Sequence, residues 1–228
     1  MDIYRVTCPP KTGPGVKFVA CPSPGIVPKD DYLYRHPDDP SDQGGSWREV
    51  LCNYNNTPQN NPDSLLPAWK LYRPLAKPAI YRDLVGRFGI KKTFILSAGW
   101  GLISANFLTP CYDITFSTDT NVKKYKRRRD EHGYDDLCLL PEGITDRIVF
   151  VGAKSYIRLF CRLTESYKGP RTVFYYSADL PKRGCGNLVR FPAKKRRNWQ
   201  YECAEALISG ELVFDTSTCL WKFGNDWL

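Results

Sequence analysis

Two short apolar segments separated by one amphipathic stretch constrain the fold of this chain most. Residues 147–151 (RIVFV) and 171–176 (RTVFYY) are continuous apolar runs of the kind found in strands buried on both faces. Residues 153–167 lie between them and have one apolar helical face, formed by Tyr156, Ile157, Phe160 and Leu163. This pattern predicts two parallel strands joined by a crossover helix.

Two further apolar runs extend this pattern. Residues 16–21 (VKFVAC) and 93–97 (TFILS) also predict buried strands, and residues 79–88 predict a helix that leads into the second strand. Small or turn-forming residues follow all four strands. The fold class that we expect is α/β, with a single three-layer α/β/α domain around a short, mostly parallel four-stranded sheet.

The remaining segments are assigned to the same domain, residues 1–228. Residues 22–70 are rich in Pro, Asp, Asn and Gly and predict a long loop insertion, which either lines a site or is a mobile surface excursion. Residues 199–228 predict a C-terminal edge element, with a helix over 201–209 and a strand over 212–214.

The charge of the chain favours one class of partner. Lys and Arg number 33 against 24 Asp and Glu, which gives a formal net charge of +9. Such an excess favours polyanions, and nucleic acid above all. The nine cysteines are odd in number and no two have CxxC spacing, so with two histidines they indicate neither a metal site nor a disulfide scaffold. We expect no metal and no cofactor.

The composition also bears on location. The amino terminus lacks the basic and apolar regions of a secretion signal, and no segment contains the ~18 apolar residues of a membrane span. We therefore expect a cytoplasmic monomer without a membrane partner, in a reducing compartment.

The carboxyl ends of the predicted strands indicate where a ligand would bind. Parallel strands place these ends at one edge of the sheet, and ligands of such folds bind there. Ser97 and Trp100 follow the strand at 93–97 and are candidate base-binding residues, with a structural glycine turn as the alternative. Lys154 and Ser155 follow the strand at 147–151, where the start of a helix can hold a DNA phosphate; a plain helix cap is the alternative for Ser155.

Two basic clusters, residues 123–129 and 194–197, lie beside aromatic residues. Basic runs with neighbouring aromatics are typical of phosphate contacts combined with base stacking, although a solvated loop is the common alternative. The predicted DNA-binding residues in these clusters are Lys126, Arg127, Arg128, Lys194, Lys195, Arg196 and Arg197.

Three segments resemble motifs of the uracil-DNA glycosylase superfamily. Residues 20–25 (ACPSPG) resemble the G-x-N-P-G or G-Q-D-P-Y motif that follows that family's first strand. Residues 148–152 (IVFVG) resemble its third strand, and residues 176–181 (YSADLP) occupy the place of its final loop. The resemblance implies a uracil-DNA-glycosylase-like fold, DNA as partner and cleavage of an N-glycosidic bond.

Two departures from that family concern the catalytic group. Ser23 stands where these glycosylases place Asp or Asn, and the final loop lacks its histidine. A serine hydroxyl can position water but has no charge with which to stabilise an oxocarbenium-like sugar. A carboxylate from elsewhere must then serve. The candidates are Asp113 and Asp179, each with an ordinary turn role as the alternative.

A second resemblance concerns the segment ILSAGWGLI at residues 95–103. Together with PCYD at 110–113 it is similar to the ILSAxxGLxxP…PYD signature of YaaA-like proteins, a bacterial DNA-associated group. Tyr112 in this signature is a further candidate for stacking on a base.

Three functions remain open. The leading one is a DNA glycosylase that flips a modified base and hydrolyses its N-glycosidic bond. The small Ser23 would make room for a hypermodified base of phage DNA, which implies antiviral defence. The alternatives are a non-catalytic YaaA-like DNA-binding protein and a transglycosylase or nucleoside-processing enzyme.

Overall fold

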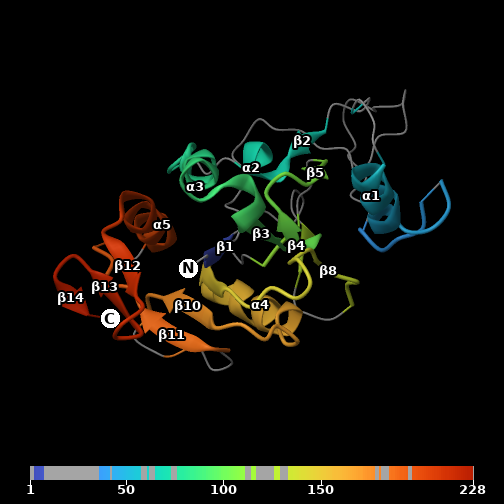
Figure 1. Cartoon of the computed structure of the whole chain (residues 1–228). Coiled ribbons are helices and arrows are strands. Elements are labelled where there is room, and N and C mark those ends of the chain that lie inside the picture. Colours follow the sequence, from blue (N-terminus) through green and yellow to red (C-terminus); the bar gives the residue numbers. More distant parts are fainter. Residues whose placement is uncertain are drawn as a thin grey trace.

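The largest sheet of the protein has seven strands and is mostly parallel (Figure 1). The computed structural model describes residues 3–7, 36–41, 43–57, 61, 65–72, 76–110, 114–116, 126–128, 133–177, 180, 185–194 and 197–227, with only the backbone for 3–7, 115 and 126–127. The strand order is β11-β10-β9-β1-β3-β4-β8. These strands are β1 (Ile3–Thr7), β3 (Thr93–Ser97), β4 (Gly101–Ser104), β8 (Leu137–Cys138), β9 (Arg147–Val151), β10 (Arg171–Tyr175) and β11 (Asn187–Arg190).

The predicted α/β class and the parallel pairing are confirmed. From β11 to β3 every neighbouring pair is parallel, whereas β4 runs antiparallel to β3 and β8 runs parallel to β4. The expected number of four strands is wrong. The extra strands are short or polar: in β11, for example, Val189 alone is buried, so no continuous apolar run indicates this strand.

Three of the four predicted strands are present, as β3, β9 and β10. The fourth, at residues 16–21, lies outside the described residues, and β1 occupies the position between β9 and β3. The crossover between β9 and β10 contains a 3-10 turn, η2 (Lys154–Tyr156), followed by the helix α4 (Ile157–Leu163). The predicted strand-helix-strand unit is therefore confirmed, with a shorter helix.

Helices cover both faces of the sheet. Successive strand residues point to opposite faces, so Phe150 of β9 stacks on Phe160 of α4, at 4.8 Å between ring centroids, while Val149 and Val151 pack with α5 (Trp199–Ser209). The helix α3 (Ile80–Phe88) lies beside α5, as Figure 1 shows. Both α3 and α5 correspond to predicted helices, and the short turn η1 (Ile90–Lys92) leads from α3 into β3.

The segment expected to be a loop insertion contains regular structure. It includes α1 (Trp47–Asn56), α2 (Ala68–Leu71) and β2 (Leu66–Pro67), which pairs with β5 (Leu108–Thr109). A capping box begins α1: the Ser46 hydroxyl accepts the Glu49 N–H, and the Glu49 carboxylate accepts the Ser46 N–H. The expectation of a loop is therefore wrong over α1. A separate parallel pair is formed by β6 (Ile114–Thr115) and β7 (Lys126–Arg127).

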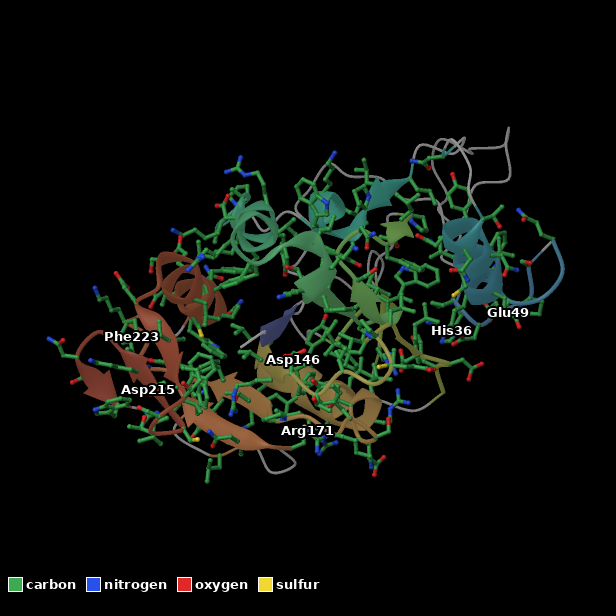
Figure 2. The ribbon with its side chains drawn as sticks, in the orientation of Figure 1. His36, Glu49, Asp146, Arg171, Asp215 and Phe223 are labelled. Atoms are coloured by element: carbon green, nitrogen blue, oxygen red, sulfur yellow. A yellow bond between two sulfur atoms is a disulfide. The ribbon has the colours of Figure 1, made fainter. Side chains whose placement is uncertain are left out.

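The C-terminal segment, for which the sequence predicts an edge element, contains a three-stranded sheet of its own. This antiparallel tail sheet comprises β12 (Leu212–Asp215), β13 (Leu220–Phe223) and β14 (Asp226–Trp227). Trp221 anchors it, because this side chain is 1% exposed, packs edge-on against Phe174 and donates its indole N–H to the Thr172 hydroxyl at 3.3 Å. Figure 2 shows Asp215 and Phe223 of the tail sheet on the opposite side of the molecule from His36 and Glu49.

Two cysteines depart from the expectation that the thiols are unpaired. Cys161 of α4 and Cys185, which precedes β11, form a disulfide with their Cα atoms 5.5 Å apart. Cys203 of α5 behaves as a small core residue instead, and burial raises the pKa of its thiol well above the usual range. In the described part of the chain, no helix is both long and apolar enough to cross a bilayer.

Candidate functional site

The order in which the chain adds strands reverses direction at the centre of the sheet, between β1 and β9, and we call this place the switch point. The chain passes from β1 to β3 on one side of it, and then builds β9, β10 and β11 in order on the other side. In such doubly wound sheets the ligand crevice lies outside the carboxyl ends of the strands where the direction changes. Thr7 at the end of β1 pairs with Val151 of β9 and with Ile95 of β3, so these carboxyl ends are level. We call this side of the sheet the carboxyl edge.

Lys154 and Ser155 lie at this switch point. Both follow β9 directly and are exposed in η2, which has no side-chain cap. The structure therefore places the two residues at the carboxyl edge, where the sequence located them. Their contact with a DNA phosphate stays a prediction.

The segment after β3 is a tight turn that returns the chain as β4. Its residues 98–100 join two antiparallel strands, with Ser97 paired to Gly101. The Ser97 hydroxyl accepts the N–H groups of Gly99 and Trp100, at 3.2 and 2.9 Å. Ser97 is 0% exposed and Trp100 is 3% exposed, so neither lies at the mouth of a pocket in this structure. A base-binding role for these two residues stays a prediction that requires the groups covering them to move.

Arg48 of α1 binds the outer half of this turn. Its guanidinium donates to the carbonyl oxygens of Gly99 and Trp100, each at 3.0 Å, and to both carboxylate oxygens of Asp38. Arg48 is 4% exposed. Burial raises the pKa of Asp38, but the hydrogen bond and charge of Arg48, the Asp135 N–H and His36 outweigh it and hold that pKa below its usual value. Asp38 is thus an anion at neutral pH.

Arg128 binds the inner half of the turn. It donates to the Ala98 carbonyl oxygen at 2.9 Å and to both oxygens of Asp136, at 2.8 and 2.6 Å. Arg162 of α4 donates to Asp136 as well. The Arg128 and Asp136 side chains are both 0% exposed. The guanidinium of Arg128 is therefore enclosed in this structure, and its contact with a DNA phosphate stays a prediction that requires the groups covering it to move.

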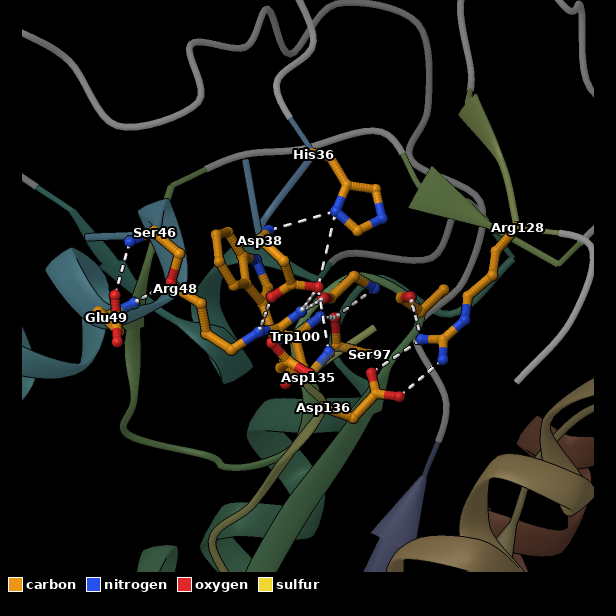
Figure 3. A network of polar contacts seen from close by, with 12 residues as sticks. His36, Asp38, Ser46, Arg48, Glu49, Ser97, Trp100, Arg128, Asp135 and Asp136 are labelled. Atoms are coloured by element: carbon orange, nitrogen blue, oxygen red, sulfur yellow. Dashed lines mark hydrogen bonds and ion pairs between the residues drawn. The ribbon is translucent and has the colours of Figure 1, made fainter. Parts of the chain in front are cut away.

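Together these groups form one buried network around residues 98–100 (Figure 3). Each carbonyl oxygen of the turn accepts an N–H from a buried arginine, and the Asp135 N–H donates to Asp38 at 3.0 Å, which joins the two halves. Buried charges are tolerated only when they are paired and hydrogen-bonded. The network therefore fixes the shape of the turn.

One end of the network reaches the surface at His36. Its ring lies 4.1 Å from that of Tyr134, measured between centroids, and its Nδ1 accepts the Asp38 N–H at 3.2 Å. The side chains of His36 and Asp38 are 18% and 15% exposed. Tyr134 also packs on Arg128, 3.8 Å from the guanidinium carbon to the ring centroid, and burial raises the pKa of its hydroxyl.

Sequence reasoning missed His36, Asp38, Arg48 and Asp136 as neighbours of the turn. The capping box at Ser46 and Glu49 was the available signal for α1, and hence for the position of Arg48. For the others the sequence contains no local signal, since their partners are distant in the chain.

A second group of predicted residues lies where β10 and β11 end. Lys194 and Arg197 are exposed, and the Lys194 N–H donates to the Glu202 carboxylate at 3.0 Å. Tyr176 follows β10, and its ring stacks with that of Trp199, the first residue of α5. The structure thus brings the second basic cluster and two aromatic rings together at the carboxyl edge. We call Tyr176 and Trp199 the aromatic pair.

Of the remaining predicted residues, two lie in the short strand β7. Only the backbone of Lys126 and Arg127 is described, in β7. The predicted catalytic and stacking residues, and two of the basic ones, lie outside the described residues: Ser23, Tyr112, Asp113, Asp179, Lys195 and Arg196. Among the described residues, no group of three His, Cys, Asp or Glu side chains is arranged to hold a metal ion.

Comparisons with known proteins do not assign the chain to a family. No family model, curated protein or solved structure matches the chain.

Proposed function

We propose that this protein is a DNA glycosylase, with a single three-layer α/β/α domain similar to the uracil-DNA glycosylases. It binds DNA as a monomer, flips a modified base to the carboxyl edge and hydrolyses the N-glycosidic bond of that base. The modified bases of phage DNA are the substrates we propose, which makes the protein an antiviral enzyme.

The observation that carries the proposal is the register of the parallel strands. It brings the ends of β3, β9, β10 and β11 to one edge, and these ends hold small polar, basic and aromatic residues. Cations that track phosphates and rings that stack on bases are the two components of a nucleic-acid groove. A net charge of +9 supports the same partner.

The proposed reaction requires a group that stabilises positive charge on the sugar. As the bond from C1′ to the base nitrogen breaks, its electrons leave with the base. Water then attacks C1′, and the proton that the water loses balances the negative charge on the departing base. We propose Asp113 or Asp179 as the carboxylate that stabilises the sugar, with the Ser23 hydroxyl positioning the water. Asp38 is ionised, but Arg48 and the Asp135 N–H occupy its oxygens. We therefore assign Asp38 the role of positioning Arg48, not that of the catalytic carboxylate.

The test is an assay for base release. The protein is incubated with unmodified, uracil-containing, hydroxymethylated and glucosylated DNA, and the products are examined for abasic sites and free base. We expect abasic sites on a modified substrate, and their loss in Asp113→Ala or Asp179→Ala. Absence of product on every substrate would sink the enzymatic proposal. Exchange of one base for another would instead identify a transglycosylase.

One observation favours a second function, that of a non-catalytic YaaA-like DNA-binding protein. The residues 97–100 of the YaaA-like signature are buried and held by Arg48 and Arg128, which is the arrangement expected of a structural element. This alternative predicts strongly salt-dependent DNA binding without base release. It also predicts that Asp113→Ala and Asp179→Ala leave the binding constant unchanged.

A further inference from the structure

We propose that the aromatic pair, Tyr176 and Trp199, is a binding site for an unpaired nucleobase of a DNA strand. The two ring centroids are 6.4 Å apart and the ring planes differ by 23°, so the rings are close to parallel. Both side chains are partly exposed. Aromatic rings of this kind are the surfaces on which single-stranded nucleic acids stack their bases.

Hydrogen bonds order the backbone next to both rings before any ligand binds. The Phe191 N–H donates to the Tyr175 carbonyl oxygen at 2.8 Å, which fixes the end of β10 against the segment after β11. Glu202 of α5 accepts the Lys194 N–H, which fixes that segment against the helix that begins at Trp199. A site that is already ordered loses less conformational entropy on binding.

The charges around the aromatic pair indicate which ligand fits. Lys194 and Arg197 are exposed in the segment that leads to Trp199, and the sequence places Lys195 and Arg196 between them. The two exposed cations Lys194 and Arg197, together with two rings, match a polyanion that also has flat bases. A duplex keeps its bases stacked in its interior, so an unpaired or flipped nucleotide can reach these rings and a paired one cannot.

This inference rests on DNA as the partner but not on the catalytic step. The experiment measures the affinity of the whole protein for three labelled probes of equal length: a single-stranded DNA, the same strand built of abasic units, and a duplex. We expect the wild type to bind the base-containing strand about 5- to 150-fold more tightly than the abasic strand, the range that stacking one base supplies.

Trp199→Leu keeps apolar bulk and removes stacking, so it should abolish most of this preference while affinity for the abasic strand is retained. Trp199→Phe should keep the preference. Trp227→Leu is the matched control. Trp227 of β14 is 48% exposed, and its ring centroid lies 5.6 Å from Lys222 Nζ, but it belongs to the tail sheet. If Trp199→Leu does not fold, as thermal unfolding will show, Tyr176→Leu replaces it.

The proposal is overturned if the wild type binds both single strands equally, or if Trp199→Leu or Tyr176→Leu keeps the full preference. It is also overturned if Trp227→Leu loses the preference to the same degree. Base release is measured in parallel on the same proteins. A retained stacking preference without base release would refute the glycosylase proposal and leave the nucleobase site intact.

Discussion

Two regions of the same sheet edge use positive charge in opposite ways. Around the turn at 98–100, Arg48 and Arg128 are buried and each is paired with an aspartate. Where β10 and β11 end, Lys194 and Arg197 are exposed beside the aromatic pair. Buried, paired cations determine the local structure, whereas exposed cations beside aromatic rings are available to a partner. Density of positive charge in the sequence therefore does not by itself locate a binding surface.

The helix α4 links the buried network to the start of β11, at the edge of the sheet opposite the aromatic pair. Arg162 reaches Asp136 of the buried network, and the adjacent Cys161 is joined to Cys185, which precedes β11. Substitutions in the network should therefore change stability, and substitutions beside the aromatic pair should change binding.

The largest effect is expected for Asp136→Ala. It leaves the Arg128 guanidinium buried without its carboxylate, which typically destabilises a protein by about 3–5 kcal/mol. Urea denaturation measures the free energy of unfolding. Asp135→Ala is the matched control: its side chain is exposed and its backbone N–H still donates to Asp38, so a change within about 0.5 kcal/mol is expected. Equal effects of the two substitutions would contradict a structural role for the network.

The disulfide should have the next largest effect. Closing a loop of 24 residues stabilises the folded state by about 3 kcal/mol, chiefly by restricting the unfolded chain. The double variant Cys161→Ser with Cys185→Ser, compared with Cys138→Ser, should lower the free energy of unfolding by this amount under oxidising conditions. Under reducing conditions the wild type should match the double variant. A wild type that does not respond to reductant would show that the bond does not form in solution.

The parts of the fold that depend on local sequence could be predicted. The apolar runs of β3, β9 and β10 and the helical spacing of α3 identify strands and helices because each pattern is complete within a few residues. The helix α1 was also predictable from its capping box, although the Pro, Asp and Asn around it indicate a loop. The short strands β4 and β8 could not be predicted, because these residues form strands only through pairing with neighbouring strands of the folded sheet.

The buried network could not be predicted for the same reason. The partners of the turn lie 30 residues downstream at Arg128 and about 50 residues upstream at Arg48. Both arginines occur in charged segments that look solvated in the sequence. The small residues at 97–100 suit either a ligand or a close approach of other groups, and only tertiary structure shows that arginine side chains fill the space.

Asp38→Asn tests the outer half of the network and should have a smaller effect than Asp136→Ala, since Asp38 is 15% exposed. Loss of the charged partner of Arg48 should cost about 1.5–3 kcal/mol at pH 7. The pKa of Asp38 is lower in the folded than in the unfolded protein, so its stabilisation is fully present above the unfolded pKa of about 3.9.

The same stabilisation is lost as the pH falls through the lower, folded pKa. Urea midpoints of the wild type and Asp38→Asn should therefore converge between about pH 5 and the acid limit of folding. A constant difference over that range would mean that the carboxylate charge does not stabilise the turn.

The smallest effect on stability, and the clearest on binding, is expected for Lys194→Ala and Arg197→Ala. Both side chains are exposed, so the free energy of unfolding of each variant should lie within about 0.5 kcal/mol of that of the wild type. If each cation neutralises one phosphate of single-stranded DNA, each substitution should reduce the slope of log binding constant against log salt concentration by about 0.7. Lys168→Ala is the control, because this exposed lysine precedes β10 at the opposite edge of the sheet and should leave the slope unchanged. Equal slopes for the wild type and the three variants would show that the phosphate contacts lie elsewhere. Lys194 and Arg197 would then have no binding role to set against the structural role of the buried Arg48 and Arg128.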